Sequence, residues 1–481
     1  MKHTRRILLF GTAISAILVL SARVLIQGYA DHEDETDHRL SYLLEVDNSH
    51  TDSIHYRDGS EPKLPSQDWH QLLGPKMNST TIEPLVDGLG HDSVLVEAWR
   101  SAAGTGYSAP IARDDDVVLF HRIGDRVCID CLSLRSGKSK WRFEKPTTYR
   151  CRFEYSSGPY STPVIDEEFV YAWCAEGDLV CVSRKTGELV WERALYTDYE
   201  GTVEYFPVAT SPLLLEGKLI LNVGGSKPNS GIIALDKETG QTIWQSTNER
   251  ASYATPVAGK MHDRQVVFVL GYDHLLALNP LNGKVHWQIE FHGKNRELGK
   301  LNACSPLVMG NQVLVSAMGV GAMSVSHLSN DTPQVLWRTN ARGVSNQYVN
   351  LVPNGDGVFG FTTRSRSLTY FDAKSGAPLG DWDCILGREP HIIGLNDSLL
   401  ILSEDGILAR AILVHGKPMV HYLSEDPFLD GPCLTSPVAT KGRILLRNER
   451  TLLCLRSEMR VVDSNGRIER STSDSAPREL D

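Results

Sequence analysis

One short pattern recurs along the chain and constrains its fold more than any other feature. The stretch from Lys185 to Trp191 has a glycine four residues before a tryptophan, and close relatives of it end at other tryptophans. The intervals between successive tryptophans of this series are 43 to 53 residues. A period of that length indicates repeated supersecondary units that stack on one another. The tryptophans in question are Trp141, Trp191, Trp244, Trp287, Trp337 and Trp382.

Each repeat also begins alike, with small residues that lead to a proline. Between this opening and the tryptophan lie short β-branched runs separated by turn residues, such as 169–174 and 179–183 on either side of Glu176-Gly177-Asp178. Such runs predict strands, and the glycine and aspartate clusters predict hairpin turns. One unit is therefore expected to contain four antiparallel strands, with the proline in the first. The openings are 107–110, 160–163, 210–212, 253–256, 304–306 and 435–437.

Four-stranded units of this kind predict the blades of a propeller, an architecture that leaves only short, protected sheet edges. Degenerate openings at 347–353 and 391–395 add two units, and the last unit, from Pro437 to Leu455, lacks a fourth strand. The run Val94–Trp99 resembles a fourth strand with no partner before it. We therefore expect an all-β, eight-bladed β-propeller over residues 67–460, closed by this N-terminal strand. The expected docking residues between blades are Trp99, Trp141, Trp191, Trp244, Trp287, Trp337 and Trp382.

The segments outside the repeats have different compositions. Residues 1–30 place basic residues before the apolar run Ile7–Leu20, the pattern of a signal peptide. An uncleaved membrane anchor is the alternative, and either would export the body of the protein to the periplasm or cell envelope. Residues 31–66 predict an acidic flexible linker, and 461–481 a disordered tail. The formal charge of −10 opposes nucleic-acid binding, which requires clustered Lys and Arg.

The nine cysteines are too few for a disulfide framework in a chain of 481 residues. Cys128 and Cys131 are three apart on a predicted strand, which places them on opposite faces. Cys174 and Cys181 flank a predicted hairpin turn and could form a bridge across it. Two buried free thiols are the alternative.

The segment Leu235–Trp244, with its Leu-Asp-x-x-Thr-Gly-x-x-x-Trp pattern, resembles the pyrroloquinoline-quinone (PQQ) propeller repeat. That family includes quinoprotein alcohol dehydrogenases and the non-enzymatic, BamB-like assembly lipoproteins. The opening 68–75 also resembles the start of BamB-like proteins that are abundant in planctomycete-type bacteria. The dehydrogenases typically carry two adjacent cysteines over the quinone, and no two cysteines are adjacent in this sequence. The resemblance therefore favours the non-catalytic branch, with PQQ and calcium retained as the cofactors of the alternative.

The connections that follow the tryptophan strands are long and contain many aromatic and charged residues. In a four-stranded blade these connections share one face of the ring with the turns between the second and third strands. Exposed aromatic residues on loops of a rigid scaffold are a common binding arrangement. The alternative is that the loops merely cap the channel. The candidate binding face comprises Tyr155, Tyr160, Asp198, Tyr199, Glu204, Tyr205 and Phe206.

These observations lead to one functional hypothesis and one alternative. We expect an exported, monomeric, non-catalytic scaffold that binds an envelope protein or a polymer through the loop-rich face, without catalytic residues or a metal. The alternative is a PQQ-dependent alcohol dehydrogenase of the polyvinyl-alcohol type. Within the leading hypothesis, Trp191 is expected to be buried between blades, whereas Tyr199 and Tyr205 are expected to be at least partly exposed.

Overall fold

The structure is a computed structural model of the chain. It describes residues 67–83, 89, 93–153, 155–201, 206–261, 264–293, 302–326, 332–362, 367–383, 386, 390–396, 398–414, 417–459, 461–462 and 468–469. The predicted leader (1–30) and linker (31–66) lie outside these residues. Within the described ranges, no helix is long and apolar enough to cross a membrane.

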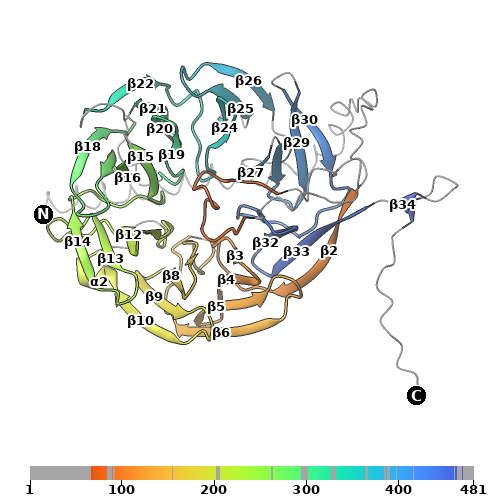
Figure 1. The fold of residues 1–481 in the computed structure, drawn as a ribbon, viewed down its shortest axis with the longest axis horizontal. Helices are drawn as coiled ribbons and strands as arrows, with labels where there is room; N and C mark the ends of the chain where they lie inside the picture. The colour runs from red at the N-terminus through yellow and green to blue at the C-terminus, as the bar shows by residue number, and fades with distance from the viewer. Residues whose placement is uncertain are drawn as a thin grey trace, which may run out of the picture. The chain divides into compact units, whose positions relative to one another are not determined.

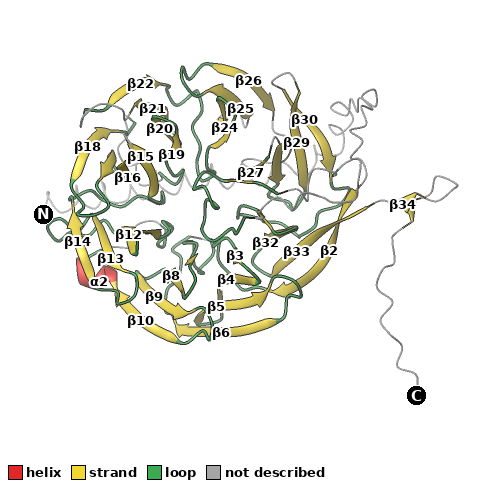
Figure 2. Cartoon of the chain, in the orientation of Figure 1, coloured by secondary structure: helices red, strands yellow, loops and turns green. Residues whose placement is uncertain are grey.

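Eight antiparallel sheets form the blades of a propeller, as the repeats predict (Figures 1 and 2). The first strand of each blade lies nearest the centre and the fourth lies at the rim. Blade 1 is β3 (Ile111–Arg113), β4 (Asp116–Ile123), β5 (Arg126–Ser133) and β6 (Ser139–Pro146), and blade 2 is β7 (Val164–Ile165), β8 (Phe169–Trp173), β9 (Asp178–Ser183) and β10 (Leu189–Ala194). Blade 3 is β11 (Leu213–Leu215), β12 (Lys218–Asn222), β13 (Ile232–Asp236) and β14 (Thr242–Ser246), and blade 4 is β15 (Val257–Met261), β16 (Arg264–Leu270), β17 (His274–Leu278) and β18 (Val285–Glu290).

The remaining blades continue the same order around the ring. Blade 5 is β19 (Leu307–Met309), β20 (Gln312–Ala317), β21 (Gly321–Ser326) and β22 (Gln334–Arg338); blade 6 is β23 (Val352–Asn354), β24 (Gly357–Thr362), β25 (Ser367–Asp372) and β26 (Pro378–Asp383); blade 7 is β27 (His391–Leu395), β28 (Ser398–Leu402), β29 (Leu408–Val414) and β30 (Lys417–Leu423). Blade 8 is β31 (Val438–Thr440), β32 (Arg443–Arg447), β33 (Thr451–Met459) and β2 (Ser93–Ala102). A separate two-stranded sheet, β34 (Val461–Val462) with β35 (Ile468–Glu469), lies in the segment expected to be disordered.

The ring is closed by pairing between the two ends of the repeat region. Strand β2 pairs antiparallel with β33 from Ser93 opposite Met459 to Ala102 opposite Thr451. Residues that are more than three hundred positions apart in the sequence therefore become neighbours in one sheet. The predicted closure by an N-terminal strand is confirmed.

Five of the repeat tryptophans donate a hydrogen bond to the next blade. The Trp141 indole Nε1 donates a hydrogen bond to the Arg184 carbonyl at 2.7 Å, and Gly187, three residues further on, lies against the same ring. Gly187 has a φ of 75°, and a Cβ at this position would lie 2.5 Å from the Trp141 ring. Glycine is therefore favoured here for two reasons: the turn requires a left-handed conformation, and the indole ring leaves no room for a side chain. The same donor and acceptor pairing joins Trp99 to Leu134, Trp191 to Lys237, Trp244 to Pro280 and Trp337 to Ala373.

The tryptophans are buried to different extents. Trp99, Trp244 and Trp287 are buried, whereas Trp141, Trp191, Trp337 and Trp382 are half-buried. Trp191 was expected to be buried, but it lies on the outermost strand of its blade, whose outer edge is in contact with solvent. One face of its ring therefore packs on Gly240 while part of its surface stays accessible.

Hydroxyl groups of the openings link neighbouring blades near the centre. Thr162 Oγ1 accepts from the Ala109 backbone N–H at 3.0 Å, and Ser211 Oγ accepts from the Thr162 N–H at 2.9 Å. The series continues through Thr255, Ser305 and Asn350. In these openings the proline precedes the first strand rather than lying within it, because β3 begins at Ile111, directly after Pro110. Proline, which has no backbone N–H, therefore lies outside the hydrogen-bond ladder of the sheet.

The core is divided into separate hydrophobic clusters between adjacent blades. One cluster joins Tyr171 and Trp173 of blade 2 to Leu219 and Ile233 of blade 3, and others repeat this arrangement. Cys181 belongs to this cluster, whereas Cys174 belongs to the cluster between blades 1 and 2. The two thiols point to opposite faces of blade 2 and are free. The disulfide alternative is therefore wrong for this pair.

Residues 67–83 cross the centre of the ring, and we call this segment the strap (Figure 1). Trp69 pairs with Ala112 of blade 1, and β1 (Thr80–Thr81) pairs in parallel with β27 of blade 7. Further hydrogen bonds reach blade 2 through His70, blade 4 through Met77 and blade 8 through Gln67. The strap is thus tied to five of the eight blades.

Candidate functional site

The long connections after the fourth strands open on the same face as the turns between second and third strands, as expected. We call this the loop face. The connection from β6 to β7 carries Phe153, Tyr155 and Tyr160, and the connection from β10 to β11 carries Phe206. Residues that belong to different blades can therefore meet above the ends of the strands.

Six aromatic side chains gather on the loop face around Phe206, and we call them the aromatic patch. The ring centroid of Phe206 lies 5.8 Å from Phe153 and 5.5 Å from Tyr155. It lies 6.3 Å from Tyr160 and 5.9 Å from Tyr253, within the range of favourable aromatic pairs. The sixth member, Tyr107, is 4.6 Å from Tyr160. Tyr155 is 55% exposed and Phe153 is 43% exposed, so the patch presents apolar surface to solvent.

Hydrogen bonds from the tyrosine hydroxyls hold the loops of the patch in place. The Tyr107 hydroxyl accepts from the Ser156 N–H at 3.3 Å, and the Tyr160 hydroxyl donates to the Ser156 carbonyl at 3.1 Å. The Tyr253 hydroxyl accepts from the Phe206 N–H at 2.9 Å. Burial raises the pKa of Tyr107 to about 12, so its hydroxyl stays protonated at neutral pH. The half-buried members thus support the two exposed rings.

Two buried arginines fix the same loops from below. Arg122 donates to the Ser157 carbonyl at 3.0 Å and to the Gly124 carbonyl at 2.7 Å. Arg447, which is fully buried, donates to the carbonyls of Gly104, Ser108 and Phe120 at 2.9, 2.8 and 3.2 Å. Burial lowers the pKa of Arg447 to about 10, which still leaves it charged at pH 7. A binding surface held in this way loses little conformational entropy when a partner binds.

Two of the residues expected on the binding face have other roles. Tyr199 is 4% exposed, and its hydroxyl lies 2.5 Å from Thr242 Oγ1. The reason is local: residues Leu195–Tyr199 form the helix α2, so Leu195 and Tyr199, four apart, face the core together. The carboxylate of Asp198 pairs with Arg193 at 2.7 Å at the side of this helix. Glu204 and Tyr205 lie outside the described residues.

Sequence reasoning placed Tyr155, Tyr160 and Phe206 in the site but missed the other members of the patch. Tyr107 and Tyr253 occupy the same position as Tyr160, three residues before the proline of a repeat opening. This shared position was the available signal. Phe153 carries no such signal, because it lies inside a long connection of irregular sequence.

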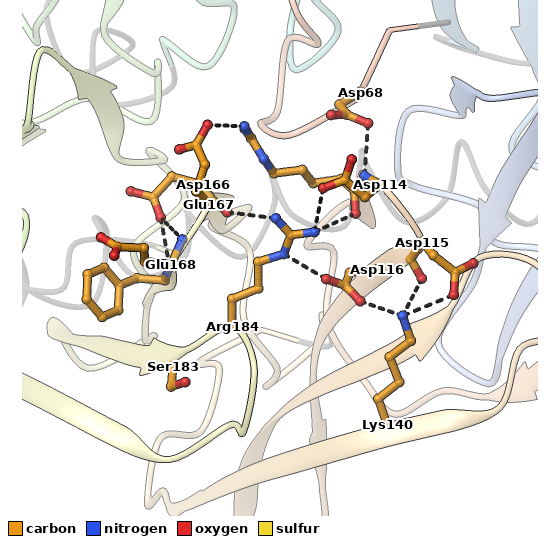
Figure 3. Close-up of polar contacts among 12 residues, drawn as sticks. Asp68, Asp114, Asp115, Asp116, Lys140, Asp166, Glu167, Glu168, Ser183 and Arg184 are labelled. Carbon is orange, nitrogen blue, oxygen red and sulfur yellow. Dashed lines mark hydrogen bonds and ion pairs between the residues drawn. The ribbon is translucent and has the colours of Figure 1, made fainter.

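The opposite face carries a network of ion pairs (Figure 3). Arg184 of blade 2 pairs with Asp114 at 2.8 Å and with Asp116 at 2.7 Å, both from blade 1. Lys140 pairs with Asp116 at 2.6 Å and with Asp115 at 3.1 Å. A cavity of about 290 Å³ lies here, but Arg184, Asp116 and Lys140 in its lining are already engaged with one another. The network therefore joins two blades.

Two features of the described residues bear on the PQQ and calcium of the dehydrogenase alternative. No three His, Cys, Asp or Glu side chains in the described ranges come close enough together to hold a metal ion. A ligand at the centre of the ring would have to displace the strap, where Trp69 is 1% exposed.

Comparison with known proteins finds similar chains of different kinds. An uncharacterized protein of Rickettsia conorii is 27% identical over 201 residues, which are 37% of this chain and 46% of that protein. The chain thus spans less than half the length of that relative. The crystal structure of BamB from Moraxella catarrhalis covers 76% of this chain and 98% of its own, with 16% identity and a TM-score of 0.54. A quinohemoprotein alcohol dehydrogenase from Comamonas testosteroni has 12% identity and covers 81% of this chain and 80% of its own.

The two similarities to solved structures differ in what they show. At 16% identity, the likeness to the Moraxella protein shows a shared fold. The TM-score of the dehydrogenase, 0.47, is too low to support any argument. The model of the family described as outer membrane protein assembly factor BamB matches residues 97–228 and 125–379, which together exceed half of the 481 residues. The chain, an eight-bladed propeller of PQQ-type repeats, therefore belongs to the BamB family.

Proposed function

We propose that this protein is a non-catalytic scaffold of the cell envelope that binds a protein partner through the aromatic patch. The observation that carries the proposal is the patch itself, in which Tyr155 and Phe153 are about half exposed on loops held by partly buried hydrogen bonds. Exposed aromatic side chains on a rigid support are typical of the centres of protein interfaces. Membership of the BamB family and the leader expected at 1–30 support a location outside the cytoplasm.

Site-specific photo-crosslinking in the producing cells tests this proposal. A photoreactive amino acid replaces Tyr155 in one strain and Leu281 in another. Leu281 is the matched control, because it is 63% exposed but lies in the turn between β17 and β18, on the opposite face. We expect a discrete crosslinked protein from position 155 and none from position 281. Equal crosslinking from both positions, or none from either, would contradict the proposal.

The dehydrogenase alternative has a separate test. The purified full chain is mixed with PQQ and calcium, the quinone absorbance is followed, and alcohol-dependent dye reduction is measured. We expect neither a bound quinone spectrum nor turnover, because a central ligand would have to displace Trp69 and the strap. Robust turnover would overturn the scaffold proposal.

A further inference from the structure

The loop face is divided into a basic part and an acidic part. Three arginines lie on the connections that carry the aromatic patch: Arg150, 60% exposed, Arg152, exposed, and Arg250, 51% exposed. On the side formed by blades 7 and 8, the same face carries exposed carboxylates at Asp405, Glu425, Asp426 and Asp430. Such a separation of charge orients a charged partner and excludes a wrongly placed one.

The arginines beside the patch retain hydrogen-bonding capacity toward solvent. Arg250 uses one Nη for Asp273 at 3.1 Å, and its guanidinium lies 3.4 Å above the Tyr272 ring, which fixes the plane of the group. Arg150 pairs with Asp125 at 2.6 Å, but Asp125 is itself 77% exposed, so this pair is an exposed one. Exposed pairs contribute little and exchange readily with other carboxylates. A guanidinium has five N–H donors in a planar arrangement that suits carboxylates.

The two exposed rings of the patch are inclined to Phe206, whereas the half-buried Tyr160 lies more nearly parallel to it, at 29°. Tyr155 meets Phe206 at 75° and Phe153 meets it at 49°. The exposed surface therefore lacks the parallel rings on which successive bases of a single-stranded nucleic acid stack. Inclined rings suit a compact apolar side chain, which can contact the face of one ring and the edge of another.

We propose that the aromatic patch binds a short acidic segment of a partner protein, in which one apolar side chain packs against Phe153, Tyr155 and Phe206. Carboxylates on either side of that side chain pair with Arg150, Arg152 and Arg250. The acidic side of the loop face repels the same segment and confines it to blades 1 to 3. This inference rests on the proposed function and names the chemistry of its partner.

Fluorescence polarisation with labelled synthetic peptides and the full chain tests the inference. The first probe has a phenylalanine flanked by aspartates and glutamates, the second has lysines in place of the acids, and the third has serine in place of phenylalanine. A single-stranded oligothymidylate is the fourth. We expect the first probe to bind at least about tenfold more tightly than any other, a difference of about 1.4 kcal/mol. Its affinity is expected to fall as salt is raised, because exposed charges are screened.

Variants assign the effect to the patch. Tyr155→Ala is expected to weaken binding of the first probe about tenfold. The double change Arg152→Glu with Arg250→Glu is expected to remove the preference for the acidic peptide over the lysine peptide. Tyr348→Ala is the control with no expected change, since Tyr348 is 36% exposed on another connection of the same face. An unchanged melting temperature shows that each variant is folded.

The outcomes separate the inference from the function on which it rests. If the lysine peptide or the oligothymidylate binds more tightly than the acidic peptide, the inference is wrong. The inference is also wrong if no peptide binds while position 155 still crosslinks a protein in cells, although the proposed function then stands. If position 155 crosslinks no better than position 281, both fail.

Discussion

At the scale of single residues, the contact between a tryptophan and the glycine of the next blade explains why the repeat has this sequence. The glycine adopts positive φ in the turn before the fourth strand, and the indole of the preceding blade lies directly on it. The indole N–H then satisfies a carbonyl three residues before that glycine. Loss of the glycine should therefore disturb the turn and the joint between blades together.

Gly187→Ala is expected to lower the free energy of unfolding by about 2–3 kcal/mol, combining a left-handed conformation with overpacking against Trp141. Gly217→Ala is the matched control, since Gly217 has a nearly identical φ of 76° with nothing within 4 Å of the added Cβ. We expect it to cost only the conformational part, about 1 kcal/mol. Chemical denaturation of both variants measures the difference. Equal losses would show that the contact with Trp141 contributes nothing.

A second comparison separates core tyrosines from surface tyrosines. Tyr199→Ala should cost about 3–5 kcal/mol, because it empties a buried site beside Leu195 and Val208. Tyr155→Ala should change stability by no more than about 0.5 kcal/mol, as surface substitutions do. Thermal and denaturant unfolding provide the measurement. A large loss for Tyr155→Ala would place that residue in the core and remove the main support for the aromatic patch as a binding surface.

At the scale of elements, the strap connects blades that are not neighbours in the ring. Its contacts reach blades 1, 2, 4, 7 and 8, and its Trp69 packs in the cluster that also contains residues of blades 7 and 8. Gly74 lies on the Trp69 ring, with 3.1 Å between that ring and an added Cβ. The strap is therefore part of the folded core, although it precedes the first repeat.

Removal of the strap should destabilise the whole propeller. Trp69→Ala is expected to lower the free energy of unfolding by about 3–5 kcal/mol, as other large-to-small core substitutions do. Deletion of residues 1–83 should lower the melting temperature, whereas deletion of 1–66 should leave it unchanged because every contact of the strap remains. Differential scanning calorimetry of the two truncations compares them directly. Equal melting temperatures for the two truncated proteins would show that the strap does not stabilise the propeller.

At the scale of the whole molecule, ion pairs reinforce the region where the ring closes. Lys441 of blade 8 pairs with Asp68 of the strap at 2.7 Å and with Asp114 of blade 1 at 3.4 Å. Arg184 of blade 2 continues the network to Asp114, and Lys237 of blade 3 pairs with Asp166 of blade 2 at 2.9 Å. Four consecutive blades are thus linked by charge on the face opposite the aromatic patch. Figure 3 shows the central part of this network, between blades 1 and 2.

This network predicts a loss of stability in acid. Burial raises the pKa of Asp166, but hydrogen bonds from Lys237 and from the backbone of Glu168 and Phe169 outweigh it, so the net pKa is below its usual value. Since the folded pKa is depressed, the stabilisation is present above the unfolded value of about 4 and is lost as the pH falls through the folded value. Melting temperatures between pH 7 and pH 3 measure the effect. Asp166→Asn should weaken the acid dependence; an identical dependence in this variant would exclude Asp166 as a contributor.

The sequence by itself determined the architecture because the signals of a propeller are local and repeated. The glycine before each tryptophan, the small residues before each proline and the unpaired strand 94–99 predicted the blade, the blade count and the closure. It also predicted that Tyr155, Tyr160 and Phe206 share a face, since connections at the same position of each repeat must emerge on the same side.

The tertiary structure decided what depends on contacts between distant segments. Tyr199 is buried because a single helical turn, which no repeat signal marks, directs it into the cluster between blades 2 and 3. The strap crosses the centre because its partners lie on five blades, and no local pattern in 67–83 indicates them. Tyr107, Phe153 and Tyr253 join one patch because the packing of consecutive blades brings together connections that are about fifty residues apart in the chain. Local periodicity predicts repeated strands, whereas the partners of irregular segments are set only when the blades pack against one another.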